Sequence, residues 1–212
     1  MPPDCLHLTV LEMAHSRTEA EIAAMAQEME GKIPKIVDFT YYHCARLVKP
    51  MLNYDTAAIA LSFLPAARES LPGYQITSDA YNSHHLRPHL SALCESAGIE
   101  VASRYVVQSA HLTIARFVTQ IGHAKEGDLG PESKYVAGLI KKLEDLNVNH
   151  KSLYWGKEAD DWTVGTEKGL VCRRGTVWYG GGETLHQGRG FDTYRRQTIL
   201  FVIKDSDRHL PL

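Results

Sequence analysis

A histidine followed by an apolar residue, a threonine and a second apolar residue occurs twice in this chain of 212 residues. The copies are His7-Leu8-Thr9-Val10 and His111-Leu112-Thr113-Ile114. Each lies in a short apolar run of strand length. Because side chains alternate between the two faces of a strand, the histidine and threonine of each copy share one face. The pattern therefore predicts two strands, each with an imidazole and a hydroxyl in front and an apolar back in a core.

The composition is that of an ordinary globular protein, with 44% hydrophobic and 23% charged residues. The formal net charge of −2 argues against a broad nucleic-acid-binding surface, which needs clustered basic residues. It leaves room for a small phosphate ligand or for a single nucleic-acid end.

The four cysteines, Cys5, Cys44, Cys94 and Cys172, are far apart and form no Cys-x-x-Cys pair. We expect buried thiols in a reducing compartment. No apolar run has transmembrane length, and the N-terminus lacks a signal-peptide core. We therefore expect a soluble, intracellular protein, cytoplasmic or nuclear, that does not bind a membrane and is a monomer.

Helical and strand signals alternate along the chain. Thr18 followed by Glu21 is a capping-box pattern, and it predicts a helix that ends at Gly31. Pro50 lies inside an expected strand and predicts an edge or a bulge there. The other expected helices cover residues 34–42, from Ser78 or Asp79 to Cys94, and 131–146. The other expected strands cover residues 46–53, 56–64, 99–107, 162–167, 170–179 and 198–203, with loops at 122–130 and 180–190.

These signals predict an α+β fold. Together with the repeated motif they suggest two pseudo-symmetric lobes, each an antiparallel sheet with helices, facing each other across a central groove. We expect residues 1–212 to form a single bilobal domain. Residues 99–107 would form a hairpin with the second motif strand, and residues 162–167 one with residues 170–179.

Two histidines across a groove can act as general base and general acid, because imidazole titrates near neutral pH. A symmetric pair suits in-line displacement at phosphorus, in which the attacking and leaving oxygens lie on opposite sides. Thr9 and Thr113 can donate their hydroxyls to the non-bridging oxygens. A 2′,3′-cyclic phosphate is already strained, so this chemistry requires neither a metal nor a cofactor.

The two motifs, about a hundred residues apart, resemble those of the two-histidine (2H) phosphoesterase superfamily. The flanking runs, Cys5 to Thr18 and Ser103 to Ile114, are more narrowly similar to fungal proteins of the RNA ligase/cyclic nucleotide phosphodiesterase type. The resemblance covers roughly residues 2–182. It implies that His7 and His111 are the catalytic acid–base pair and that Thr9 and Thr113 bind the phosphate oxygens. The implied substrate is a nucleoside 2′,3′-cyclic phosphate or an RNA 3′ end.

Members of this superfamily carry a strand before the first motif, for which this sequence leaves no room. Residues 183–212 also differ from the usual ending of the family. We expect residues 198–203 to fill the vacant sheet edge beside the first motif strand.

Alternative functions remain open. The same residues could join RNA ends as an ATP-independent 2′–5′ RNA ligase, or the chain could be a truncated, non-catalytic protein that binds nucleotides or RNA ends. A metallohydrolase would need a third ligand beside His85 and His89, and no His-Glu-x-x-His pattern is present. Further candidates are Arg87 and Arg104 as phosphate donors, and Tyr105 and Tyr179 as stacking platforms for a base.

Overall fold

The computed structural model describes residues 1–67, 79–102, 110–118, 133–157, 161–166, 168–177, 181–191 and 199–205. For residues 133–134 and 199–205 it describes the backbone only.

A mixed eight-stranded sheet forms the centre of the described structure, in the order β5-β2-β3-β4-β1-β8-β6-β7. β8 runs parallel to both of its neighbours, β1 and β6, and the other pairs are antiparallel. The strands are β1 (Leu8–Arg17), β2 (Arg46–Tyr54), β3 (Ala58–Pro65), β4 (Ala110–Arg116), β5 (Trp162–Thr163), β6 (Lys168–Gly175), β7 (Glu183–Arg189) and β8 (Ile199–Asp205).

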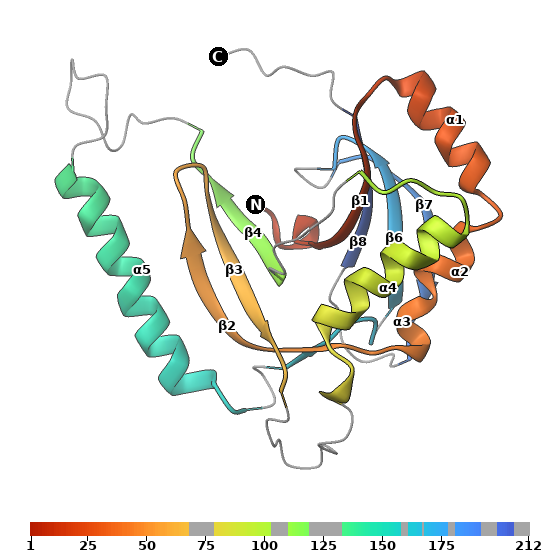
Figure 1. Cartoon of the computed structure of the whole chain (residues 1–212). Coiled ribbons are helices and arrows are strands. Elements are labelled where there is room, and N and C mark those ends of the chain that lie inside the picture. Colours follow the sequence, from red (N-terminus) through yellow and green to blue (C-terminus); the bar gives the residue numbers. More distant parts are fainter. Residues whose placement is uncertain are drawn as a thin grey trace, which may run out of the picture.

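Helices and a 3₁₀ turn accompany this sheet in the described ranges. They are η1 (Pro3–Cys5), α1 (Glu19–Met29), α2 (Ile33–Val37), α3 (Phe39–Tyr42), α4 (Ser83–Ser96) and α5 (Ser133–Tyr154). Figure 1 shows α5 beside β2, whereas α1 to α4 gather around β1, β6, β7 and β8. The α+β class is therefore confirmed.

The main core lies on one face of the sheet. Leu8 and Val10 of β1 and Leu170 and Cys172 of β6 belong to it, together with buried residues of α1, α2 and α4. Leu112 of β4 packs against the same cluster. Since neighbours along a strand point to opposite faces, the residues that alternate with these point away from the main core.

Two local predictions are confirmed. The Thr18 hydroxyl accepts a hydrogen bond from the Glu21 backbone N–H, and the Glu21 carboxylate accepts one from the Thr18 N–H, which completes the capping box of α1. The pairing of β2 with β3 shifts register between Val48 and Met51, so Pro50 lies at a bulge, as predicted.

The helix expected from Ser78 or Asp79 begins later, at Ser83, and its cap is Asn82. The Asn82 side chain accepts a hydrogen bond from the His84 N–H. Asp79 does not cap the helix because its carboxylate is bound by Arg46 of β2 in a buried ion pair. The helix still contains Pro88.

The predicted hairpin of residues 162–167 with 170–179 is wrong. β5 pairs with β2, where Trp162 packs edge-on against Phe63 with 5.4 Å between the ring centroids. β6 instead forms a hairpin with β7, which lies in the stretch predicted to be a loop. Gly175 and Gly182, both at positive φ, flank this connection.

The strand predicted at residues 99–107, before the second motif strand, is not found in its described part. Residues 99–102 form no strand, and the Ala102 N–H donates to the Met13 carbonyl. The rest of that predicted strand, and the predicted loop at 122–130, lie outside the described residues.

β8 pairs with β1, as expected of residues 198–203. Because β6 flanks the other side of β8, β8 lies inside the sheet rather than at an edge.

Candidate functional site

The two motif strands, β1 and β4, are neighbours in the sheet, although about a hundred residues separate them in the chain. They pair antiparallel with Leu8 opposite Leu112, the central apolar residues of the two motifs. One residue further along in either direction, this register places Thr9 opposite His111 and His7 opposite Thr113. Residues opposite each other in an antiparallel pair share a face, so all four polar side chains project from the face that carries no main core. The sheet thus brings all four predicted site residues together.

The four residues form a quadrilateral with the histidines on one diagonal and the threonines on the other. Directly opposite residues have Cβ atoms about 5 Å apart, and diagonal partners lie about 7–8 Å apart. A phosphorus atom above the centre would therefore have one imidazole on each of two opposite sides. This is the arrangement that in-line displacement requires.

His7 precedes its strand instead of lying within it. β1 begins at Leu8, and the 3₁₀ turn Pro3–Cys5 ends two residues before His7. The His7 Nδ1 atom is 2.9 Å from the Cys5 carbonyl oxygen at the end of that turn. A carbonyl oxygen only accepts, so Nδ1 carries the hydrogen and Nε2 of the neutral ring carries the lone pair. The turn therefore selects the tautomer that can accept a proton through Nε2.

β3 extends the polar face beyond His111. Ser62 is opposite His111, and Ala60 is opposite Thr113. On the far side of β3, Met51 and Asn53 of β2 are opposite Ser62 and Ala60. Ser62 thus places a hydroxyl beside His111 that the motif search missed. Only the alternation along residues 58–65, combined with the register, could have identified it.

Arg87 approaches the motif strand from the core side. It is 7% exposed, and its Nη2 atom donates to the Thr9 carbonyl oxygen at 3.2 Å. Arg87 and Ser83 of α4 line a cavity of about 10 Å³ against Leu8 and Ala110. The cationic donor therefore supports the backbone that carries Thr9 and does not lie on the histidine–threonine face. Arg104, Tyr105 and Tyr179 lie outside the described residues.

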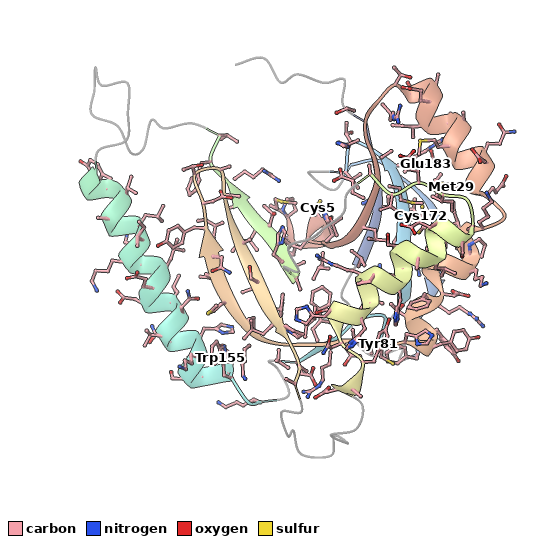
Figure 2. All side chains as sticks on the ribbon, in the orientation of Figure 1. Cys5, Met29, Tyr81, Trp155, Cys172 and Glu183 are labelled. Atoms are coloured by element: carbon pink, nitrogen blue, oxygen red, sulfur yellow. The ribbon has the colours of Figure 1, made fainter. Side chains whose placement is uncertain are left out.

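The histidines of α4 pack around an aromatic ring. His85 and His89 each lie 5.6 Å from Tyr81 between ring centroids, and the His85 Nδ1 atom accepts a hydrogen bond from the Asn82 backbone N–H. In the ranges that the structure describes, no group of three or more His, Cys, Asp or Glu side chains is placed to hold a metal ion. Figure 2 shows Tyr81 at the end of α4 and Cys5 beside the motif strands.

All four cysteines are free thiols, and two of them are buried as expected. Burial raises the pKa of Cys94 and of Cys172 to about 12, so both remain neutral and are poor nucleophiles. Cys5 is half-buried and Cys44 is exposed, which corrects the prediction for these two.

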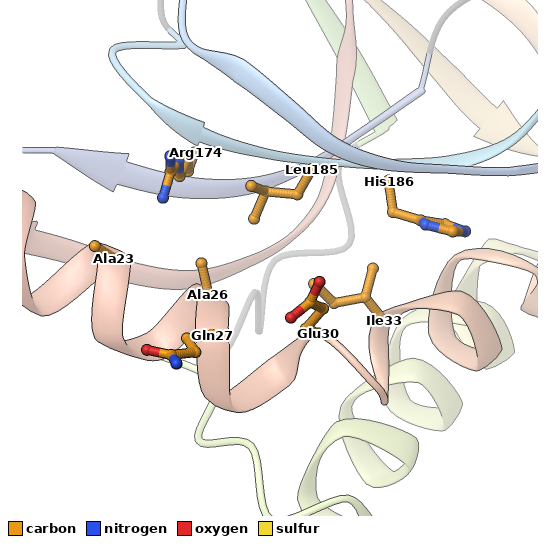
Figure 3. A pocket seen from close by; sticks show the side chains of 8 residues that line it. All are labelled: Ala23, Ala26, Gln27, Glu30, Ile33, Arg174, Leu185 and His186. Carbon is orange, nitrogen blue, oxygen red and sulfur yellow. The ribbon is translucent and has the colours of Figure 1, made fainter.

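A larger hollow, of about 320 Å³, lies on the opposite side of the sheet from the four site residues. Figure 3 shows it between α1 and strands β6 and β7, with Arg174, Leu185 and His186 on one wall and Ala26 and Glu30 on the other. It includes none of the motif residues. The candidate site is therefore defined by the strand register and by the sheet face from which the four side chains project, and not by this hollow.

Comparison of the chain with protein-family models, with curated proteins and with solved structures finds no match. No helix in the described part of the chain combines the length and the apolar character that crossing a membrane requires.

Proposed function

We propose that this protein is a metal-independent phosphoesterase that opens 2′,3′-cyclic phosphates of nucleotides or RNA ends. One observation supports this above all others. The antiparallel pairing of Leu8 with Leu112 places two histidines and two threonines alternately at the corners of one polar patch. The buried thiols of Cys94 and Cys172 do not fit as nucleophiles, because they are neutral and belong to the core.

The proposed reaction is hydrolysis with His7 and His111 as the acid–base pair. One neutral imidazole takes a proton from water, and the water oxygen forms a new bond to phosphorus. The bond from phosphorus to one ribose oxygen breaks on the opposite side, and the protonated imidazole gives its proton to that oxygen. Atoms and charges balance with water as the only co-substrate, and the two imidazoles exchange roles in the reverse direction.

Thr9 and Thr113 would bind the non-bridging oxygens. Each threonine lies beside both histidines in the quadrilateral, so its hydroxyl can reach a phosphate held between the imidazoles. Donors placed at these oxygens stabilise the charge of the transition state. The Cys5 carbonyl would keep the Nε2 atom of His7 directed to the reaction, since it holds Nδ1.

We further propose that the fold consists of two lobes that meet at the Leu8–Leu112 pair, and that an approximate twofold axis relates the two motifs. The axis does not extend to the flanking strands, because β3 runs antiparallel to β4 whereas β8 runs parallel to β1, so the second lobe is not the antiparallel sheet that the sequence predicted. One lobe would contain β2, β3, β4 and α5, and the other β1, β6, β7, β8 and the remaining helices. An antiparallel pair has a local twofold axis between its strands, which supports this interpretation. The axis exchanges His7 with His111 and Thr9 with Thr113.

The test is turnover of 2′,3′-cyclic AMP in the presence of EDTA. Replacing His7→Ala or His111→Ala should lower kcat/KM about 10²- to 10⁴-fold, the usual contribution of a general acid or base. The matched control is His15→Ala, because His15 is exposed on the same strand, β1, outside the site. It should keep the wild-type rate.

Two outcomes would contradict the proposal. Full activity in either motif variant would show that the imidazoles do no chemistry. A folded wild-type protein that binds the cyclic nucleotide without turnover would indicate a non-catalytic binding protein instead.

A further inference from the structure

The polar face that carries the motif histidines continues from β4 across β3 to β2 (Figure 1). Ala60 of β3 is opposite Thr113, and Asn53 of β2 is opposite Ala60. Residues opposite each other in antiparallel pairs share a face, so Asn53 projects from the same face as the motif residues. The next row of this face runs from His111 through Ser62 to Met51.

This face is covered toward β6 and accessible toward β2. The row of Thr9 leads across β8 to Val171 of β6, because both residues pair with the same residue of β8. Val171 is only 4% exposed and packs with Val177, so the face is covered there. Asn53, by contrast, is exposed. A ligand whose phosphate lies between the motif histidines therefore has room to extend toward β2.

The spacing of the strands determines which part of such a ligand reaches Asn53. One strand, β3, lies between β4 and β2, so the backbone of Asn53 is about 10 Å from that of Thr113. Ala60 lies between them and ends at its Cβ atom, so it leaves space for a ring. In a nucleoside 2′,3′-cyclic phosphate the base lies across the ribose from the phosphate, and a purine extends one fused ring further than a pyrimidine. The part of the ligand that reaches Asn53 is therefore the base, and a purine reaches it better.

The chemistry of Asn53 matches the edge of one purine in particular. A carboxamide presents one acceptor oxygen and two N–H donors side by side. The Asn53 side chain makes no hydrogen bond within the part of the chain that the structure describes. Adenine presents the N6–H donor beside the N7 acceptor, which a carboxamide binds with two hydrogen bonds, whereas guanine presents two acceptors, O6 and N7, at the same edge. The thioether of Met51 adds a polarisable group that packs well against an aromatic ring.

We propose that Asn53 binds the adenine base of an adenosine 2′,3′-cyclic phosphate. Its carbonyl oxygen accepts a hydrogen bond from N6–H, and its N–H donates one to N7. This inference rests on the proposed function and narrows its substrate to adenosine or an RNA end that terminates in adenosine. Asn53 contacts the base and not the reacting phosphate, so it is a specificity-determining residue.

The test compares two substrates, 2′,3′-cyclic AMP and the 2′,3′-cyclic phosphate of purine riboside, which lacks the N6 amino group. The wild-type protein should show a kcat/KM about tenfold higher for 2′,3′-cyclic AMP, the discrimination expected of a specific base contact. Asn53→Ala should bring the ratio of the two kcat/KM values close to one, because the partner of N6–H is missing. A purely structural role of Asn53 would lower both values equally and leave the ratio unchanged.

Two further variants complete the design. Asn149→Ala is the matched control, because it removes the same side chain from an exposed position on α5, outside the sheet, and it should keep the wild-type ratio. Asn53→Asp retains the size of the side chain and the acceptor for N6–H, but it loses the donor to N7. It should keep part of the preference for 2′,3′-cyclic AMP, which also guards against misfolding of the alanine variant.

The outcomes separate this inference from the proposed function. Turnover that depends on the motif histidines, with a substrate ratio unchanged by Asn53→Ala, would overturn the role of Asn53 alone. A wild-type protein that turns over both substrates equally well would do the same. Absence of histidine-dependent turnover on both substrates would overturn the proposed function and this inference together.

Discussion

Arg46 is the residue around which buried charge is concentrated. Its Nε atom donates to Asp79 Oδ1 at 3.0 Å, and its Nη1 atom is 3.6 Å from Asp161 Oδ2. Arg46 is 2% exposed and Asp79 is 4% exposed. Such a group of charges contributes little net stability when it is complete, but removal of one partner leaves an uncompensated buried charge. It fixes the start of β2 relative to the segment before α4.

Asp79→Asn should lower the free energy of unfolding by about 3 kcal/mol, because Arg46 remains charged and buried without its main counter-ion. Urea denaturation measures the change. The matched control is Asp145→Asn, which removes one partner of the exposed pair between Asp145 and Lys141 on α5. The control should shift the free energy by less than about 0.5 kcal/mol. Equal effects in both variants would contradict this account of the Arg46 cluster.

The role of Asp79 also shows what local sequence can predict about a single residue. The capping box at Thr18 and Glu21 was predicted because both partners lie within four residues. Asp79 was assigned to a cap by the same local rule, but its partner is 33 residues away. A buried arginine competes for a carboxylate more strongly than a helix N-terminus does, and only the tertiary structure reveals that competitor.

At the scale of elements, the hairpin of β6 and β7 depends on two glycines that face α2. A Cβ atom added to Gly188 would lie 2.2 Å from the Val37 carbonyl oxygen, and one added to Gly169 would lie 2.6 Å from the same atom. The backbone at the end of α2 therefore rests directly on the two strands. Both glycines are required by close backbone approach, since neither has a positive φ.

Gly188→Ala should destabilise the protein by about 1–3 kcal/mol, because backbone atoms must move to admit the methyl group. Gly138→Ala on α5 provides the opposite control, since nothing lies within 4 Å of its added Cβ. Alanine in a helix interior should there raise the free energy of unfolding by up to about 1 kcal/mol. Thermal denaturation measures the expected loss of stability in Gly188→Ala and the expected gain in Gly138→Ala. An unchanged stability of Gly188→Ala would contradict the packing described for α2.

The hairpin itself illustrates why strand partners were harder to predict than strands. Apolar alternation identified residues 170–179 as a strand, and the predicted hairpin with residues 162–167 required a turn at residues 168–169, which include Gly169. The glycine instead serves packing against Val37, and the turn lies at Gly175 and Gly182. A glycine required for a turn and one required for close packing look the same in a sequence.

At the scale of the whole molecule, the register between distant strands brings the candidate site residues together. The repeated motif predicted both motif strands and the shared face of each histidine–threonine pair. It contained no information on which strands would be neighbours. The pairing of Leu8 with Leu112 and the insertion of β8 between β1 and β6 are long-range choices, set by burial of the main core on one face. The fold class followed from the sequence, while the sheet order required the structure.

The proposed function requires that His7 and His111 work on one phosphate as a unit. Residues that act in a single step show losses that do not add when both are removed. If the two histidines acted independently, the fold-losses in kcat/KM of the single variants would multiply in the double variant.

The most direct test is therefore a double-mutant cycle on 2′,3′-cyclic AMP, with kcat/KM measured for the wild-type protein, His7→Ala, His111→Ala and the double variant. We expect the double variant to be no slower than the slower single variant. Losses that multiply in the double variant, or a single variant with wild-type activity, would contradict a shared site formed by the two motifs.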